Sequence, residues 1–134
     1  MSKLMMSLLV GSIAFGSANI ASAALSSDEY KAAVKQAQAD YKAANESCKS
    51  MKGNAKDVCV AEAKAAEKKA KANAEAEQKN DAKSRQNAIV AGAEADYDVA
   101  KVKCGAQKGN EKDVCIKEAK AAETRAKADA KASR

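Results

Sequence analysis

The chain contains no histidine, no proline and no tryptophan among its 134 residues. The absence of histidine excludes catalytic triads that use an imidazole base, and it removes the commonest metal ligand of proteins. Acidic residues are plentiful, but they alternate with lysines, as they do on solvated helix faces. We therefore expect a protein that is not an enzyme and that binds no cofactor.

Large apolar residues are also scarce. After residue 23 the chain has one leucine, no phenylalanine and three tyrosines, so it cannot build a large hydrophobic core. No aromatic residues interleave with the basic ones, and nucleic acid is therefore not an expected partner. No helix face carries the Trp, Phe or Leu that an interfacial membrane helix uses, so we expect no membrane insertion.

The first 23 residues predict an export signal. Lys3 supplies a short positive region, residues 4–18 are apolar and uncharged, and Ala21-Ser22-Ala23 has the small-residue pattern that precedes a cleavage site. The apolar run is shorter than the ~20 residues that span a bilayer. We expect cleavage near Ala23 and a periplasmic or secreted protein. The remaining residues carry 23 basic and 18 acidic side chains, so the exported chain is mildly basic.

One cysteine-containing stretch occurs twice, 56 residues apart. Cys48 and Cys59 stand at equal distances from a Gly-Asn pair, and Cys104 and Cys115 flank a second such pair in the same way. Over residues 39–76 and 95–132, 23 of 38 aligned positions are identical, which indicates an internal duplication. Four cysteines in a short exported chain indicate a disulfide framework in an oxidising compartment, with three possible pairings.

Each cysteine motif contains a helix stop followed directly by a helix start. Ala, Lys, Glu and Gln, which are strong helix formers, dominate the chain after residue 26. Gly53 and Gly109 can adopt the left-handed conformation that ends a helix, and Asn54 and Asn110 can cap the next helix. We interpret each motif as the turn of an antiparallel helical hairpin, clamped by a disulfide between its own two cysteines.

A heptad pattern supports the hairpins. Apolar or small residues that recur at alternating intervals of four and three positions are typical of a coiled-coil seam. When positions are paired symmetrically about the first turn, Tyr41 meets Ala66 and Ala37 meets Ala70, and the second copy repeats this matching. The pattern reads Tyr30, Val34, Ala37, Tyr41, Ala44, Cys48 and Met51 before the first turn, then Cys59, Ala63, Ala66 and Ala70 after it.

Two all-α architectures remain open. A continuous central helix from about Ala55 to Gln107, shared by both hairpins, would be ~80 Å long. A break near Asn80 would instead let the hairpins pack as a four-helix bundle. The expected units are the signal peptide 1–23, hairpin repeat 24–79 and hairpin repeat 80–134. We favour the elongated form, because a bundle needs a second apolar face on each hairpin. Only seven large residues are available for that face: Val58, Val60, Ile89, Val99, Val102, Val114 and Ile116.

The basic residues of the two returning helices are candidates for contact with an anionic surface, although such runs are also typical of solvated faces. We expect an envelope-associated scaffold or interaction module whose partner is an unknown envelope protein. The alternative is a binder of an anionic envelope polymer or lipid headgroup. Ala-rich seams can also pair between chains, so a homodimer is a further expected form. The candidate residues are Lys64, Lys68, Lys69, Lys71, Lys120, Arg125, Lys127 and Lys131.

The cysteine motif also carries a resemblance. Cys-x10-Cys enclosing Lys-Gly-Asn-x-Lys-Asp-Val-Cys, followed by Glu-Ala-Lys-Ala-Ala-Glu, resembles a group of small uncharacterised exported proteins of Gram-negative bacteria. In that group the same cysteine hairpin recurs in Ala/Lys-rich helices. The Ala-Lys-Ala-Glu composition also resembles the long helix of the cell-envelope protein TolA, which implies a periplasmic spanning or scaffolding role. Neither resemblance implies a catalytic residue.

Overall fold

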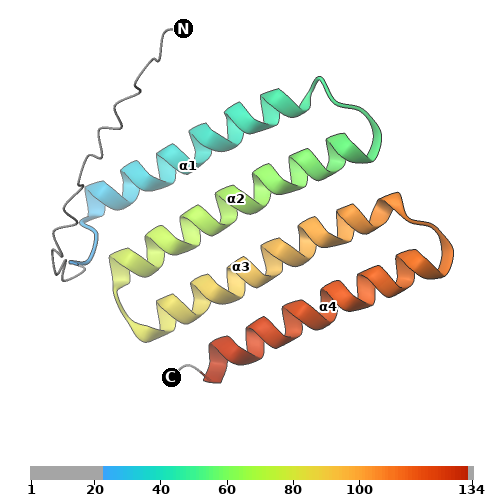
Figure 1. The fold of residues 1–134 in the computed structure, drawn as a ribbon. Helices are drawn as coiled ribbons and strands as arrows, with labels where there is room; N and C mark the ends of the chain where they lie inside the picture. The colour runs from blue at the N-terminus through green and yellow to red at the C-terminus, as the bar shows by residue number, and fades with distance from the viewer. Residues whose placement is uncertain (1–22, 133–134) are drawn as a thin grey trace, which may run out of the picture.

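The computed structural model describes residues 23–132, and these form four antiparallel α-helices (Figure 1). The all-α class and the two hairpins are confirmed. The predicted export signal lies outside the described residues, apart from Ala23. The helices are α1 (Ser27–Cys48), α2 (Gly53–Lys79), α3 (Ala82–Lys103) and α4 (Gly109–Ala132), with a short 3-10 helix η1 (Cys104–Ala106) between the last two.

The helices pack in chain order within one layer. α1 packs against α2, α2 against α3 and α3 against α4, and Figure 1 shows the four lying side by side. Each inner helix has two packing partners, whereas within residues 23–132 each outer helix packs along its length against one. The layer therefore has two broad faces and two outer edges. None of the helices in this range combines the length and apolar character needed to cross a membrane.

The chain reverses between α2 and α3 at Asn80, which adopts the left-handed conformation with φ 47° and ψ 35°. Asparagine is one of the few residues other than glycine that visits this region. Asp81 then caps α3, because its carboxylate accepts a hydrogen bond of 2.7 Å from the Ser84 backbone N–H. The break near Asn80 is confirmed, and the favoured continuous helix from Ala55 to Gln107 is wrong.

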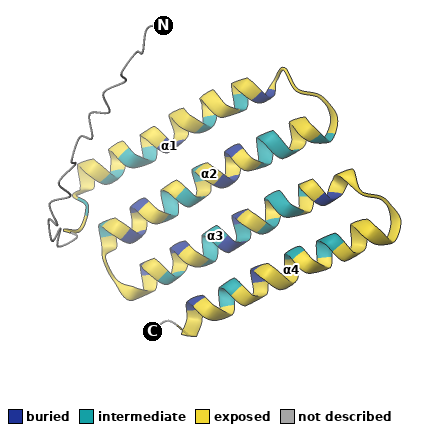
Figure 2. Ribbon diagram, in the orientation of Figure 1, coloured by how far each residue is buried: buried dark blue, intermediate teal, exposed yellow. Residues whose placement is uncertain are grey.

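The physical reason lies in the contact between α2 and α3, which is built mainly from alanine. Side chains spaced by three and four residues are buried or half-buried along both helices, and their small size lets the helices approach closely. Figure 2 shows these buried positions in the middle of the layer. Three of the seven large residues expected for a second face, Val58, Val99 and Val102, lie in this contact, but alanine supplies most of it. The stripe is Val58, Ala61, Ala65, Lys69, Ala72 and Ala76 on α2, and Ser84, Ala88, Ala91, Ala95, Val99 and Val102 on α3.

The seam between α1 and α2 follows the heptad prediction on α1 better than on α2. Of the stripe predicted before the first turn, only Ala44 on α1 and Met51 in the turn itself are exposed. On α2, Ala66 and Ala70 are exposed, whereas Ala63 and Ala74 are buried, so the expected pairing through Ala66 and Ala70 is wrong. Eleven residues separate the two buried alanines, which suits a straight helix, because a heptad stripe drifts by ~20° per repeat around a straight helix.

Candidate interaction site

Each hairpin is closed by its own disulfide. Cys48 is bonded to Cys59 and Cys104 to Cys115, with the two Cα atoms 5.7 Å apart in both bonds. The predicted pairing is confirmed. Cys48 and Cys104 are buried, and their partners are half-buried in the helical seams. The bonds join adjacent helices beside the turns, and they are consistent with an oxidising, extracytoplasmic compartment.

The turn residues are placed differently from the prediction. Gly53 and Gly109 have φ values of +59° and +55°, so both need the left-handed freedom of glycine. However, each is the first residue of the returning helix rather than the residue that ends the preceding one. The predicted capping of α2 by Asn54 is wrong: the N-cap is Lys52, which makes no side-chain capping bond. The Asn54 amide instead donates across to α3, and Asn110 likewise lies inside the first turn of α4.

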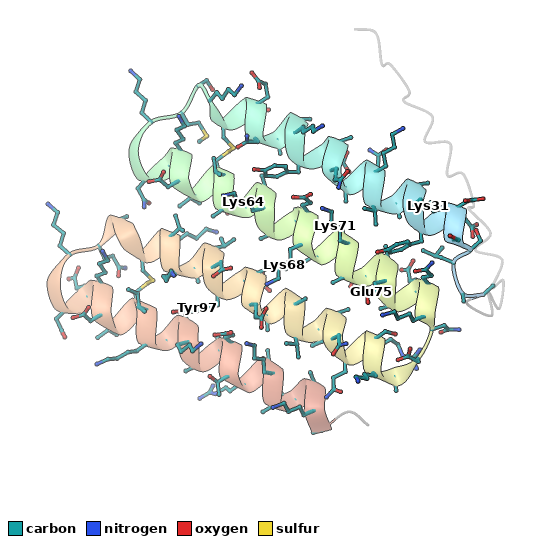
Figure 3. All side chains as sticks on the ribbon, turned by 180° about the vertical axis from the view of Figure 1, so that it is seen from behind. Lys31, Lys64, Lys68, Lys71, Glu75 and Tyr97 are labelled. Carbon is teal, nitrogen blue, oxygen red and sulfur yellow. A yellow bond between two sulfur atoms is a disulfide. The ribbon has the colours of Figure 1, made fainter. Side chains whose placement is uncertain are left out.

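Five charged residues from three helices form continuous ion pairs, which we call the charge network: Lys68 of α2, Glu94 of α3, and Lys120, Glu123 and Lys127 of α4. The Glu94 carboxylate lies 2.9 Å from Lys68 Nζ and 3.0 Å from Lys127 Nζ. The Glu123 carboxylate lies 2.7 Å from both Lys120 Nζ and Lys127 Nζ. Lys127 therefore connects the two acids, and the network joins α2, α3 and α4; Figure 3 labels its Lys68.

The lysines hold both carboxyl groups in the charged form. Hydrogen bonds from Lys68 and then Lys127 lower the pKa of Glu94 to about 2. Hydrogen bonds from Lys120 and then Lys127 lower the pKa of Glu123, and Glu123 followed by Glu94 raises the pKa of Lys127. The Glu123 side chain is only 4% exposed, so the two lysines replace the water that would otherwise solvate its charge.

The charge network extends to an aromatic ring on α3. Lys120 Nζ lies 4.8 Å from the centroid of the Tyr97 ring, and Lys101 Nζ lies 5.8 Å from it. These are cation–π distances. Tyr97 is half-buried between α3 and α4 (Figure 3), as expected for a residue of the helical seam.

Five of the eight basic residues proposed for an anionic surface take part in ion pairs within the chain. Three of them belong to the charge network. Lys69 pairs with Asp96, and Lys71 pairs with Glu67 at 2.6 Å. The other three have no ion pair within residues 23–132: Lys64, Arg125 and Lys131. The structure thus distributes these cations among acidic partners and does not collect all eight in one basic patch.

The spacing of Glu123 and Lys127 predicts an exposed ion pair on one helix; the structure contains this pair but buries Glu123, and sequence reasoning missed only Glu94. Glu123 stands three residues after Lys120 and four before Lys127, so its spacing on one helix was a readable signal. Glu94 differs from Gln38, its counterpart 56 residues earlier, and this difference between the repeats was the other available signal. The neighbouring helices that complete its pairs could not be identified while the central helix was expected to be continuous.

A groove of about 650 Å³ lies at the end of the layer where α2 turns into α3. The Leu25 backbone N–H donates a 3.2 Å hydrogen bond to the Glu77 carbonyl, which holds the segment before α1 against α2 here. Arg85 Nη1 donates a 3.2 Å hydrogen bond to Asn80 Oδ1, so this guanidinium contacts the turn. The lining mixes alanine with polar residues: Ala23, Asn73, Ala76, Glu77, Asn80, Arg85, Ala88 and Ile89.

Within residues 23–132, no group of three or more acidic or cysteine side chains is placed to hold a metal ion. The resemblances to small exported proteins and to TolA remain predictions. No protein family, curated protein or solved structure matches the chain.

Proposed function

We propose that this chain is an exported, non-enzymatic scaffold or interaction module of the cell envelope. Its disulfides support an oxidising compartment, and its first 23 residues have the pattern of an export signal. The proposed role is to present a preformed surface to another envelope component, and the partner is an envelope protein.

The observation that carries this proposal is the single layer of helices. Exposed residues predominate on the outer helices α1 and α4, and the inner helices α2 and α3 also present exposed residues between their buried positions (Figure 2). Both broad faces are therefore accessible to a partner along the length of the helices, as in the extended surfaces of repeat proteins. Disulfides and ion pairs between helices fix the arrangement in place of a large core. A surface ordered before binding loses less conformational entropy when a partner docks.

Binding of an anionic polymer or lipid headgroup is a second candidate. Lys64, Arg125 and Lys131 favour it, because their charges have no acidic partner within the described part of the chain. The candidate has less support than the scaffold, since Lys68 and Lys127 are shared with Glu94 and would have to leave that carboxylate to meet a phosphate. Binding of this kind would weaken steeply with added salt.

Photo-cross-linking in cells tests the scaffold proposal. A photoreactive amino acid replaces Lys64, which is exposed on α2 (Figure 3), and the adducts are identified by mass spectrometry. We expect one discrete adduct with an envelope protein. The same probe in a Cys48→Ala, Cys59→Ala variant is the matched control, and its adduct should be lost because the hairpin is no longer clamped.

The absence of any discrete adduct with an envelope protein would contradict the scaffold proposal. Salt-sensitive co-sedimentation with anionic vesicles, together with no protein adduct, would favour the second candidate. Equal adducts from the clamped and unclamped chains would show that the ordered layer is not what the partner recognises.

A further inference from the structure

The contact between α2 and α3 is also the contact between the two hairpin repeats, and we call it the repeat interface. A shift of 56 residues maps α1 onto α3 and α2 onto α4. The outer edge of α4 is therefore equivalent to the surface of α2 that receives α3. The outer edge of α1 is equivalent to the surface of α3 that packs on α2. Within one molecule, both outer edges face away from the layer (Figure 1).

Small residues recur at the equivalent positions of both edges. On α4, Val114 stands where α2 has Val58, and it is 44% exposed whereas Val58 is half-buried. The other small residues of the α4 edge are Ala121, Ala128 and Ala132, and those of the α1 edge are Ala32, Ala39 and Ala43; all six are exposed.

One ion pair of the repeat interface has an equivalent pair of opposite charges on the two outer edges. That interface pairs Lys69 with Asp96, and the equivalent residues on the two outer edges are Arg125 and Asp40. The opposite charges are kept although the residue type on one side has changed.

The remaining polar pairs of the repeat interface have neutral or mixed equivalents. Lys68 with Glu94 becomes Thr124 with Gln38 on the outer edges, two neutral side chains that can hydrogen-bond. Glu62 with Lys103, whose charged atoms lie 2.7 Å apart, becomes Glu118 with Ser47. None of these substitutions places like charges opposite each other.

We propose that the outer edge of α4 docks on the outer edge of α1 in a second copy of the chain, so that the repeat interface is reproduced between molecules. This inference rests on the proposed scaffold function and assigns one partner to it. The contact joins two different surfaces, and each docked copy still has one free edge. Such a head-to-tail contact extends into an open array of copies rather than closing as a two-fold dimer.

Sedimentation velocity on the purified protein, with both disulfides formed, tests this proposal. The wild-type chain should associate progressively across a concentration series that reaches the millimolar range. Asp40→Arg and Arg125→Asp each place like charges opposite one another between copies. Each single variant should require about tenfold higher concentration to associate, equivalent to ~1.4 kcal/mol.

The double variant Asp40→Arg, Arg125→Asp should associate at the wild-type concentrations, because each contact then regains opposite charges. Lys64→Asp is the matched control: it reverses an exposed charge away from both edges and should leave association unchanged. A protein that stays monomeric throughout the series would overturn the proposal. So would single variants that associate like the wild type, or a double variant that does not recover.

The self-association proposal and the scaffold proposal can be contradicted independently of each other. A monomeric purified chain that still gives the envelope-protein adduct at Lys64 would overturn self-association and leave the scaffold function in place. Association that responds to the charge reversals, without any adduct to another protein, would support self-association and contradict an envelope-protein partner.

Discussion

The side-chain amide of Asn54, in the first turn of α2, donates a hydrogen bond of 2.9 Å to the backbone carbonyl of Val102, in the last turn of α3. The bond joins the turn of one hairpin to the other hairpin. Gly105 lies next to this contact, and a Cβ atom at that position would stand 3.0 Å from the Asn54 amide nitrogen. The absence of a side chain at Gly105 therefore leaves room for the Asn54 side chain.

Asn54→Ala removes this connection between hairpins. We expect the free energy of unfolding to fall by about 1 kcal/mol, which is typical for the loss of one partly buried hydrogen bond. Urea unfolding followed by circular dichroism measures the change. Asn110→Ala is the matched control, because this equivalent side chain makes no hydrogen bond within residues 23–132. Equal losses in the two variants would mean that the bond to Val102 contributes nothing specific.

The two disulfides provide the second prediction. Both close loops with a sequence separation of 11, so the loop-entropy model gives each about 3 kcal/mol of stabilisation. Cys48→Ala, Cys59→Ala and Cys104→Ala, Cys115→Ala should therefore lower stability by similar amounts. A domain with a small core has a total stability of only a few times this value. Reducing both bonds should lower the melting temperature substantially.

Far-UV circular dichroism during heating, with and without reductant, measures this effect. The wild-type chain in reductant should melt at the lowest temperature, and each variant with one disulfide at an intermediate one. An unchanged melting curve after complete reduction would show that the helices hold together without the disulfides.

The hairpins could be predicted from the sequence because the cysteines, the glycines and the duplication all indicate the same turn. Gly53 and its repeat Gly109 have the expected left-handed conformation, and the cysteines pair across each turn. Local signals of this kind need no knowledge of neighbouring helices. Local signals do not show how the two hairpins pack against each other, because that packing depends on side chains distant in sequence.

The repeat interface shows why the rest could not be predicted. Ala65 and Ala95 are buried between α2 and α3, but alanine is also common on the exposed helix surfaces of this chain. No composition rule separates the two kinds of alanine. Glu94 presents the same problem, because its role depends on Lys68 and Lys127, which come from two other helices. Such side chains can be recognised as part of a site only when the packing of the neighbouring helices is known.

The pKa of Glu94 provides a pH-dependent prediction. Its value in the folded chain is about 2, against an ordinary 4.5. The folded pKa is depressed, so the stabilisation is fully present above about pH 4.5 and is lost as the pH falls toward 2. The side chain is 41% exposed, and solvent screening limits the contribution to about 1 kcal/mol.

Glu94→Gln should lower the free energy of unfolding near neutral pH, and the difference from wild type should shrink as the pH falls through this window. Urea unfolding at a series of pH values measures it. Glu67→Gln is the control, because within residues 23–132 the ion pair of Glu67 is with Lys71 of its own helix, and such pairs contribute about 0.2–0.5 kcal/mol. A constant difference at every pH would exclude the charge of Glu94 as the cause.

Asn80 decides between the observed layer and a continuous helix, so its substitution tests the architecture itself. Alanine disfavours the left-handed conformation by about 1–2 kcal/mol and also favours continuation of the helix. Asn80→Ala should therefore destabilise the reversal between α2 and α3. Small-angle X-ray scattering should show a larger radius of gyration in any population whose hairpins have separated, and urea unfolding should show the loss of stability.

Asn80→Gly separates backbone conformation from side-chain contacts. Glycine keeps the left-handed conformation without strain but removes the Oδ1 atom that accepts a hydrogen bond from Arg85. Arg85→Ala removes the same hydrogen bond and leaves Asn80 in place. If conformation dominates, Asn80→Gly and Arg85→Ala should both stay close to wild type while Asn80→Ala does not. Equal losses in all three variants would instead assign the reversal to the hydrogen bond, because all three variants lack that contact.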